Sequence, residues 1–123
     1  MVDLKGYRVE ELTLVNKIQE DVEFGLTHTE NYSVGYSGDN ICVGKLELLI
    51  TASDEKIPFK IKAVILAQFK FDDGDSQQYI HVSSFNELFP YIRMIITNLT
   101  TSAGMASLII PKIDISSAEI KPA

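Results

Sequence analysis

The segment IPFKIKAVILAQFKF, residues 57–71, carries the most regular pattern in the sequence. Its odd-numbered positions are all apolar, whereas lysine and glutamine occupy most of the even-numbered ones. Successive side chains of a strand point to opposite faces, so this alternation predicts one long β-strand with a fully apolar face and a mixed face. The apolar face consists of Ile57, Phe59, Ile61, Ala63, Ile65, Ala67, Phe69 and Phe71.

A second strand is expected directly before this one. Residues 41–52 are rich in β-branched and apolar residues, which indicates a strand buried on both faces. Residues 53–56 have the composition of a hairpin loop, and residues 37–40 that of a turn.

More strands are expected nearer the N-terminus. In residues 7–15 the apolar positions slip from odd to even between Val9 and Leu12, which indicates a bulge or a bend. Residues 22–26 and 32–36 alternate cleanly and are separated by a polar stretch that we interpret as a turn. The expected total is four or five antiparallel strands.

The C-terminal third changes to helical periodicity. Its apolar stripe consists of Leu88, Ile92, Ile95, Ile96 and Leu99. The β-branched residues lower the intrinsic helix propensity, so packing on the apolar sheet face must hold this helix. Gly104 is the expected stop. The predicted fold class is therefore α+β, with an antiparallel sheet followed by one main helix packed on one face.

The start of this helix is set by two conflicting residue patterns. Ser84 and Glu87 fit a capping box. Pro90 would then lie inside the helix, where it removes a hydrogen bond and clashes with the preceding turn. We therefore predict a short first turn, a break, and Pro90 at the start of the main helix.

Composition restricts the class of protein. The 123 residues suit a single domain over residues 1–123, with residues 116–123 expected to be frayed. The N-terminus lacks an apolar signal region, so a cytoplasmic location is expected. The net charge of −6 argues against nucleic acid and anionic membranes as partners. The lone Cys42 lies in an apolar pattern and is expected to be a small buried hydrophobe.

Residues that could perform catalysis or bind a metal do not cluster in the sequence. His28 and His81 are isolated, and no phosphate loop or nucleophile motif is present. The run from Asp72 to Asp75 lacks the glutamate that an EF-hand loop needs at its twelfth position, which is Ser83 here. We expect neither an enzyme nor a metal or cofactor site.

Aromatic and aliphatic residues alternate in the short N-terminal strands, as in Phe24, Tyr32 and Tyr36. Two interpretations are open. Exposed side chains would form an apolar groove that binds a polypeptide. Alternatively, the same residues form a second buried layer such as a subunit interface. Periodicity alone does not choose between the two interpretations, and we give more weight to the buried layer.

The segment NELFPYIRMIITNLTTSAGMASLIIP, residues 86–111, resembles the SecB family of bacterial export chaperones. The resemblance rests on an LFPYxR motif, a small-residue break and an apolar run that ends in Pro111. Upstream, residues 21–24 and 50–53 also match the family pattern, so the resemblance covers roughly residues 7 to 115. The motif residues are Leu88, Phe89, Pro90, Tyr91 and Arg93.

The resemblance implies a four-stranded antiparallel sheet with helices on one face, assembled as a dimer of dimers. It implies an ATP-independent chaperone that binds non-native polypeptide clients in apolar grooves. The client-binding residues expected here are Phe24, Leu26, Tyr32, Val34 and Tyr36.

Two departures from the family pattern bear on its partners. The acidic face that docks the SecA motor retains Asp21 but carries Lys60 and Lys62 where the family has Leu-x-Glu. Both lysines are expected on one face, where they would weaken the docking of a basic tail. The family's second helix is expected to be shortened or missing, because only 12 residues follow Pro111.

The leading hypothesis is a general chaperone of non-native clients. A chaperone dedicated to one partner, such as the antitoxin of a toxin–antitoxin pair, is the rival within the same class. An interaction module without clients and a small-ligand binder are alternatives from other classes, and the second has no supporting polar cluster.

Overall fold

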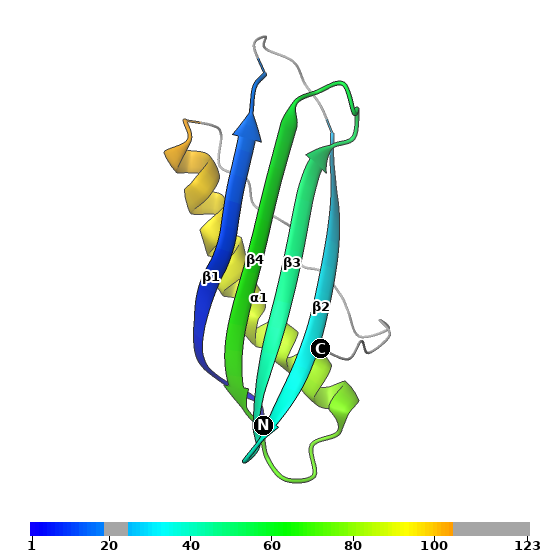
Figure 1. Ribbon diagram of the computed structural model, residues 1–123, viewed down its shortest axis with the longest axis vertical. Coiled ribbons are helices and arrows are strands. Elements are labelled where there is room, and N and C mark those ends of the chain that lie inside the picture. Colours follow the sequence, from blue (N-terminus) through cyan, green and yellow to red (C-terminus); the bar gives the residue numbers. More distant parts are fainter. Residues whose placement is uncertain (19–24, 105–123) are drawn as a thin grey trace.

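The computed structural model describes residues 1–18 and 25–104. These residues form a four-stranded antiparallel sheet whose one face is crossed diagonally by a single long helix (Figure 1). The order across the sheet is β1-β4-β3-β2. The elements are β1 Asp3–Asn16, β2 Leu26–Gly38, β3 Ile41–Ala52, β4 Phe59–Lys70 and α1 Gln77–Ser102. The predicted α+β class, with one helix on one face of a four-stranded sheet, is confirmed.

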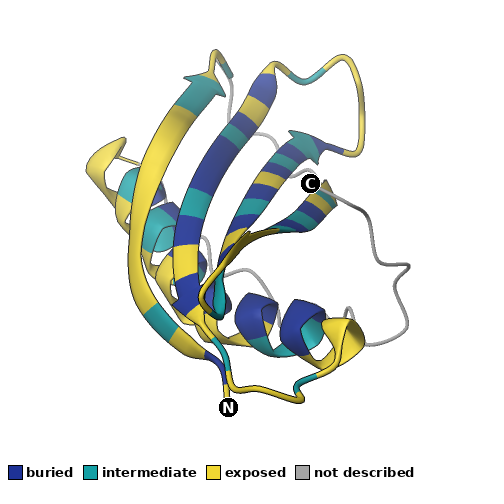
Figure 2. Ribbon diagram, turned by 60° about the horizontal axis from the view of Figure 1, so that its bottom comes forward, coloured by how far each residue is buried: buried dark blue, intermediate teal, exposed yellow. Residues whose placement is uncertain are grey.

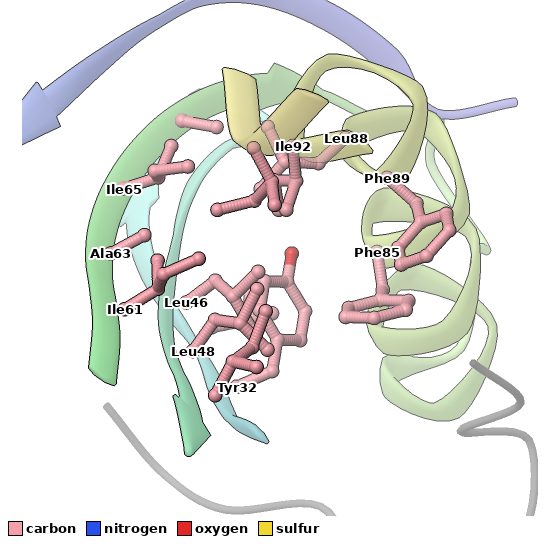
Figure 3. Packing of buried hydrophobic residues seen from close by; sticks show 14 of the residues in the cluster. Tyr32, Leu46, Leu48, Ile61, Ala63, Ile65, Phe85, Leu88, Phe89 and Ile92 are labelled. Carbon is pink, nitrogen blue, oxygen red and sulfur yellow. The ribbon is translucent and has the colours of Figure 1, made fainter. Parts of the chain in front are cut away.

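The core lies between the sheet and α1. In β4 the odd-numbered side chains face α1, and Ile61, Ile65 and Phe69 are each 0% exposed. The helical stripe meets this face from the other side, where Figure 3 shows Leu88 and Ile92. Ile92 and Ile96 are also fully buried. The alternation read from residues 57–71 therefore identifies the buried face correctly.

The turn between β2 and β3 and the irregularity in β1 lie where the sequence predicts them. β2 and β3 are joined through Asp39 and Asn40, whose φ angles of 56° and 59° fit the two-residue turn favoured in hairpins. The register of β1 against β4 shifts between Leu4 and Gly6 and again between Val9 and Glu11. The second shift confirms the bulge predicted from the slip in periodicity.

Two predictions about the strands are wrong. β2 is continuous through the polar stretch after Leu26, with no turn there. Polar residues are tolerated because β2 is an edge strand, and Thr27 Oγ1 lies 3.1 Å from Thr51 Oγ1 across the pair. β3 is buried on one face only, since α1 covers only one side, and buried residues alternate with exposed or intermediate ones along it (Figure 2). On the uncovered face Val43 is 38% exposed.

The helix begins earlier than predicted. Its N-cap is Ser76, whose side chain accepts a hydrogen bond from the Tyr79 backbone N–H at 3.1 Å. The prediction of a cap at Ser84 and a start at Pro90 is wrong, because α1 continues through both positions. At the other end Gly104 adopts φ +78° just past the helix, as predicted for the stop.

Candidate functional site

Two of the expected client-binding residues lie in the core. Tyr32 and Val34 are 6% and 5% exposed, beneath the N-terminal half of α1. The Tyr32 hydroxyl lies 2.6 Å from Ser84 Oγ, and Ser84 also donates to the backbone carbonyl of His81. Burial raises the pKa of Tyr32. The expectation that Tyr32 and Val34 line a client groove is therefore corrected, since neither side chain is accessible while α1 is docked.

Tyr32 fits against β3 because of a glycine. A Cβ on Gly44 would collide with the Tyr32 hydroxyl and lie 2.9 Å from two of its ring carbons. The ring also packs against Phe85, with centroids 5.4 Å apart in an edge-to-face arrangement. Figure 3 shows Tyr32 inside the layer between the sheet and the helix.

His81 borders the same buried site. Its ring centroid is 5.3 Å from that of Tyr32, and only 2% of the residue is exposed. The buried Nδ1 has no hydrogen-bond partner in the part of the chain that the structure describes. Burial lowers the pKa of His81, because the charged imidazolium would lose its hydration there.

The other expected client-binding residues lie at the ends of β2. Leu26 and Tyr36 are 38% and 43% exposed and point to the same side of the sheet as α1. Tyr36 packs edge-to-face on Phe71 at 5.8 Å between ring centroids. Phe24 falls outside the described residues. The outer edge of β2 carries no further strand among residues 1–18 and 25–104.

The motif residues lie along the middle of α1 and divide between core and surface. Leu88 is fully buried, and Phe89 is 7% exposed with the Arg93 guanidinium 5.1 Å from its ring centroid. Pro90 faces solvent inside the helix. Tyr91 is 40% exposed and packs against Tyr7 of β1 at 5.2 Å between ring centroids.

Tyr91 belongs to an exposed apolar group that we name the β1–α1 patch. The sequence did not indicate the helical members of this patch, because Pro90 was predicted to start the main helix. The patch consists of Tyr7, Val9, Leu12, Tyr91 and Met94, with exposed fractions of 37%, 39%, 39%, 40% and 47%.

The opposite side of the sheet carries the two lysines. We call it the helix-free face, meaning the strand side chains that point away from α1. Lys60 and Lys62 lie on it together, as predicted, because both alternate with the buried odd-numbered residues of β4. Lys62 Nζ lies 3.4 Å from a carboxylate oxygen of Glu11. Asp21 lies outside the described residues.

Residues 1–18 and 25–104 contain no cluster of three or more His, Cys, Asp or Glu side chains that could hold a metal ion. Cys42 is 0% exposed, and burial raises its pKa to about 11, so its thiol is neither accessible nor ionised near neutral pH. Within these ranges no helix is long and apolar enough to cross a membrane.

Comparison with known proteins relates the fold to a chaperone. No protein-family model matches the chain. No curated protein matches it in sequence either. Among solved structures, one similar chain is the SecB-like chaperone Rv1957 of Mycobacterium tuberculosis, in complex with a ChAD peptide from the HigA1 antitoxin. That match has a TM-score of 0.69 and 11% identity, and covers 92% of this chain and 88% of the other.

A second similar structure is a protein of unknown function from Streptococcus agalactiae. Its TM-score is 0.53 at 9% identity, over 91% of this chain and 98% of the other. At such identities the likeness establishes the fold. With its four-stranded antiparallel sheet and long diagonal helix, this chain has the SecB-like fold.

Proposed function

We propose that this protein is an ATP-independent chaperone that binds non-native polypeptide in an extended form in the cytoplasm. The observation that carries the proposal is an edge strand with exposed apolar side chains in a SecB-like fold. Leu26 and Tyr36 flank the buried centre of β2 on the α1 side of the sheet. The solved relative with this fold holds an antitoxin peptide.

The client would add to the outer edge of β2. Main-chain hydrogen bonds to an edge strand hold an extended segment without regard to its sequence, while alternate side chains supply selectivity. Leu26 and Tyr36 are ten positions apart, a distance of about 33 Å in a strand. A client segment of about ten residues would therefore contact both, and each fully buried contact would contribute about 1.5–3 kcal/mol before ordering costs.

The expected set of client-binding residues is thereby revised. Phe24, Leu26 and Tyr36 remain in the proposal, with Phe71 added because it packs on Tyr36. Tyr32 and Val34 support the strand from beneath. The proposed mechanism involves no covalent chemistry, cofactor or nucleotide.

A chaperone dedicated to one antitoxin is the second candidate. It is favoured by the antitoxin peptide in the complex of the M. tuberculosis SecB-like chaperone. Lys60 and Lys62 support it as well, because two cations on the helix-free face would disfavour the basic tail of the SecA motor. Without SecA docking, the protein would not deliver general export clients to that motor.

The decisive experiment measures the aggregation of several unrelated unfolded proteins, without nucleotide, as this protein is added. Suppression is expected, and the double variant Leu26→Ser with Tyr36→Ser should lose most of it. The matched control is Thr29→Ala, which alters the opposite face of the same strand. Undiminished suppression by the double variant would reject the β2 site.

The same assay separates the two candidates. A general chaperone protects most members of the panel. A dedicated chaperone protects none of them, yet co-purifies from its native host with a single small partner. Failure in both assays would reject chaperone function altogether.

A further inference from the structure

The helix-free face is basic although the chain as a whole carries a net charge of −6. The strand registers place its charged residues, because each is, or pairs with, an even-numbered residue of β4, whereas Lys5 and Glu10 lie at the two register shifts of β1. The basic members are Arg8, Lys45, Lys60, Lys62 and Lys70, and the acidic members are Asp3, Glu11 and Glu47. Basic residues therefore outnumber acidic ones on this face and nowhere else on the sheet that the structure describes.

Part of this positive charge is not neutralised within the chain. Lys62 lies 3.4 Å from Glu11, Lys45 lies 3.6 Å from Glu47 and Arg8 lies 3.9 Å from Glu10, all as partly exposed surface pairs. Such pairs are weak and exchange readily for other partners. Lys60 makes no ion pair with any residue in the described ranges, although it is exposed.

Apolar residues lie beside these cations. A shallow hollow of about 310 Å³ near Arg8 is lined by Gly6, Val43, Leu66 and Gln68. A second hollow of about 300 Å³ is lined by Lys60 and Lys62 of β4, by Glu47, Leu48 and Leu49 of β3, and by Thr29, Glu30 and Asn31 of β2. Lys62 and Leu66 are four positions apart on β4, which corresponds to about 13 Å. The two hollows therefore lie within reach of one short extended peptide.

We propose that the helix-free face docks an acidic segment of a partner protein. Its carboxylates would approach Lys60 and Lys62, and an apolar side chain of the same segment would rest on Val43 and Leu66. This surface lies on the opposite side of the sheet from Leu26 and Tyr36, so the docked segment would not occupy the side-chain contacts proposed for the client. Charge complementarity of this kind determines partner choice and association rate more than affinity.

Other occupants fit the face less well. A basic segment would meet the unpaired Lys60 and is repelled. Nucleic acid is disfavoured by the acidic chain as a whole. Proteins that bind single-stranded nucleic acid usually stack its bases on aromatic side chains. Among the described residues, no Phe or Tyr side chain lies on the helix-free face.

The test uses a fluorescent peptide in which glutamate alternates with leucine, and a matched peptide in which lysine replaces glutamate. Fluorescence anisotropy should show binding of the acidic peptide only, weakening by about tenfold between low and physiological salt. Reversal of charge by Lys60→Glu with Lys62→Glu should reduce the affinity by at least about tenfold. The double variant Lys5→Glu with Lys56→Glu changes the net charge equally at exposed positions outside the set and should bind nearly normally.

Three results would overturn the proposal. Equal binding of both peptides would show contact through apolar residues alone. Equal loss in the control variant would show an unspecific charge effect. Tighter binding of a single-stranded RNA of similar length would identify a polyanion site. Suppression of aggregation by the Lys60→Glu, Lys62→Glu variant tests client binding separately, so this proposal and the proposed function fail independently.

Discussion

At the scale of single residues, the buried site around Tyr32 joins three elements. Tyr32 comes from β2, its space against the sheet comes from Gly44 of β3, and its hydrogen-bond partner Ser84 comes from α1. A buried hydroxyl without a partner costs about 1–3 kcal/mol. This site therefore fixes the position of the N-terminal half of α1 on the sheet more specifically than apolar contact alone.

Replacement of Gly44 by alanine should destabilise the protein. The added Cβ would lie 2.9 Å from ring carbons of Tyr32, so the ring must move and the bond to Ser84 must lengthen. Overpacking of this kind costs about 1–3 kcal/mol, measurable as a lower free energy of unfolding in chemical denaturation. Gly6→Ala is the control, because nothing lies within 4 Å of a Cβ there. Equal effects of the two variants would contradict the tight fit.

His81 should make stability depend on pH. Its pKa in the folded protein is lowered from 6.5 by burial, so below about pH 6.5 the unfolded chain binds a proton that the folded chain does not. Stability should fall as the pH falls through 6.5, and this loss should end only below the folded pKa. Denaturation midpoints from about pH 8 to about pH 5 measure the slope.

The variant His81→Phe provides the comparison for that slope. It keeps an aromatic ring beside Tyr32 and removes both the titration and the unpaired Nδ1. Its stability should vary less with pH than that of the unaltered protein over the same range. An unchanged slope would assign the pH dependence to other groups.

At the scale of elements, α1 is a long helix that tolerates a proline. Pro90 lacks an N–H, so the carbonyl of Asn86 has no helical donor at that position. Both residues lie on the exposed side of α1, where solvent can satisfy the Asn86 carbonyl. Packing of the buried stripe, with Leu88 and Ile92 on either side of Pro90, holds the helix together through this weak point.

Pro90→Ala should therefore stabilise the protein. The substitution restores one helical hydrogen bond and a good helix former at an exposed position, for a gain of about 1–3 kcal/mol in the free energy of unfolding. Glu87→Ala, another exposed change on the same helix, should alter stability by less than about 0.5 kcal/mol. Loss of stability in Pro90→Ala would mean that the proline shapes the helix for its packing on the sheet.

At the scale of the whole molecule, apolar side chains are exposed in two separate regions. The outer edge of β2 carries Leu26 and Tyr36, and the β1–α1 patch lies at the opposite edge of the sheet. Exposed apolar patches on an edge strand favour association. We propose that the β1–α1 patch joins copies of this chain, within a dimer of dimers, and leaves β2 free for a client.

Light scattering at tens of micromolar should report an oligomer. Val9→Glu with Leu12→Glu places two charges in the β1–α1 patch and should shift the protein toward the monomer, because burial of unpaired charge opposes association. Tyr79→Ser removes an exposed aromatic residue outside the patch and should leave the oligomer intact. A monomeric unaltered protein would contradict the assembly.

The sequence by itself determined the sheet, its buried face and the class of fold. The alternation in residues 57–71 and the stripe through Ile92 and Ile96 both indicate which face of their element is buried. The sequence alone shows this, because apolar residues recur along the chain with the period of the strand or the helix. The bulge after Val9 and the end of α1 at Gly104 were also predictable, because each depends on backbone geometry within a few residues.

Only the tertiary structure decided what the alternating residues of β2 do. Tyr32, Val34 and Tyr36 have the same periodicity, yet α1 buries the first two and leaves Tyr36 exposed. The start of α1 at Ser76 was likewise not evident locally, since Ser84 offers the better capping pattern and packing overrides it. These outcomes depend on where a diagonal helix crosses the sheet, and that position results from contacts between residues far apart in the chain.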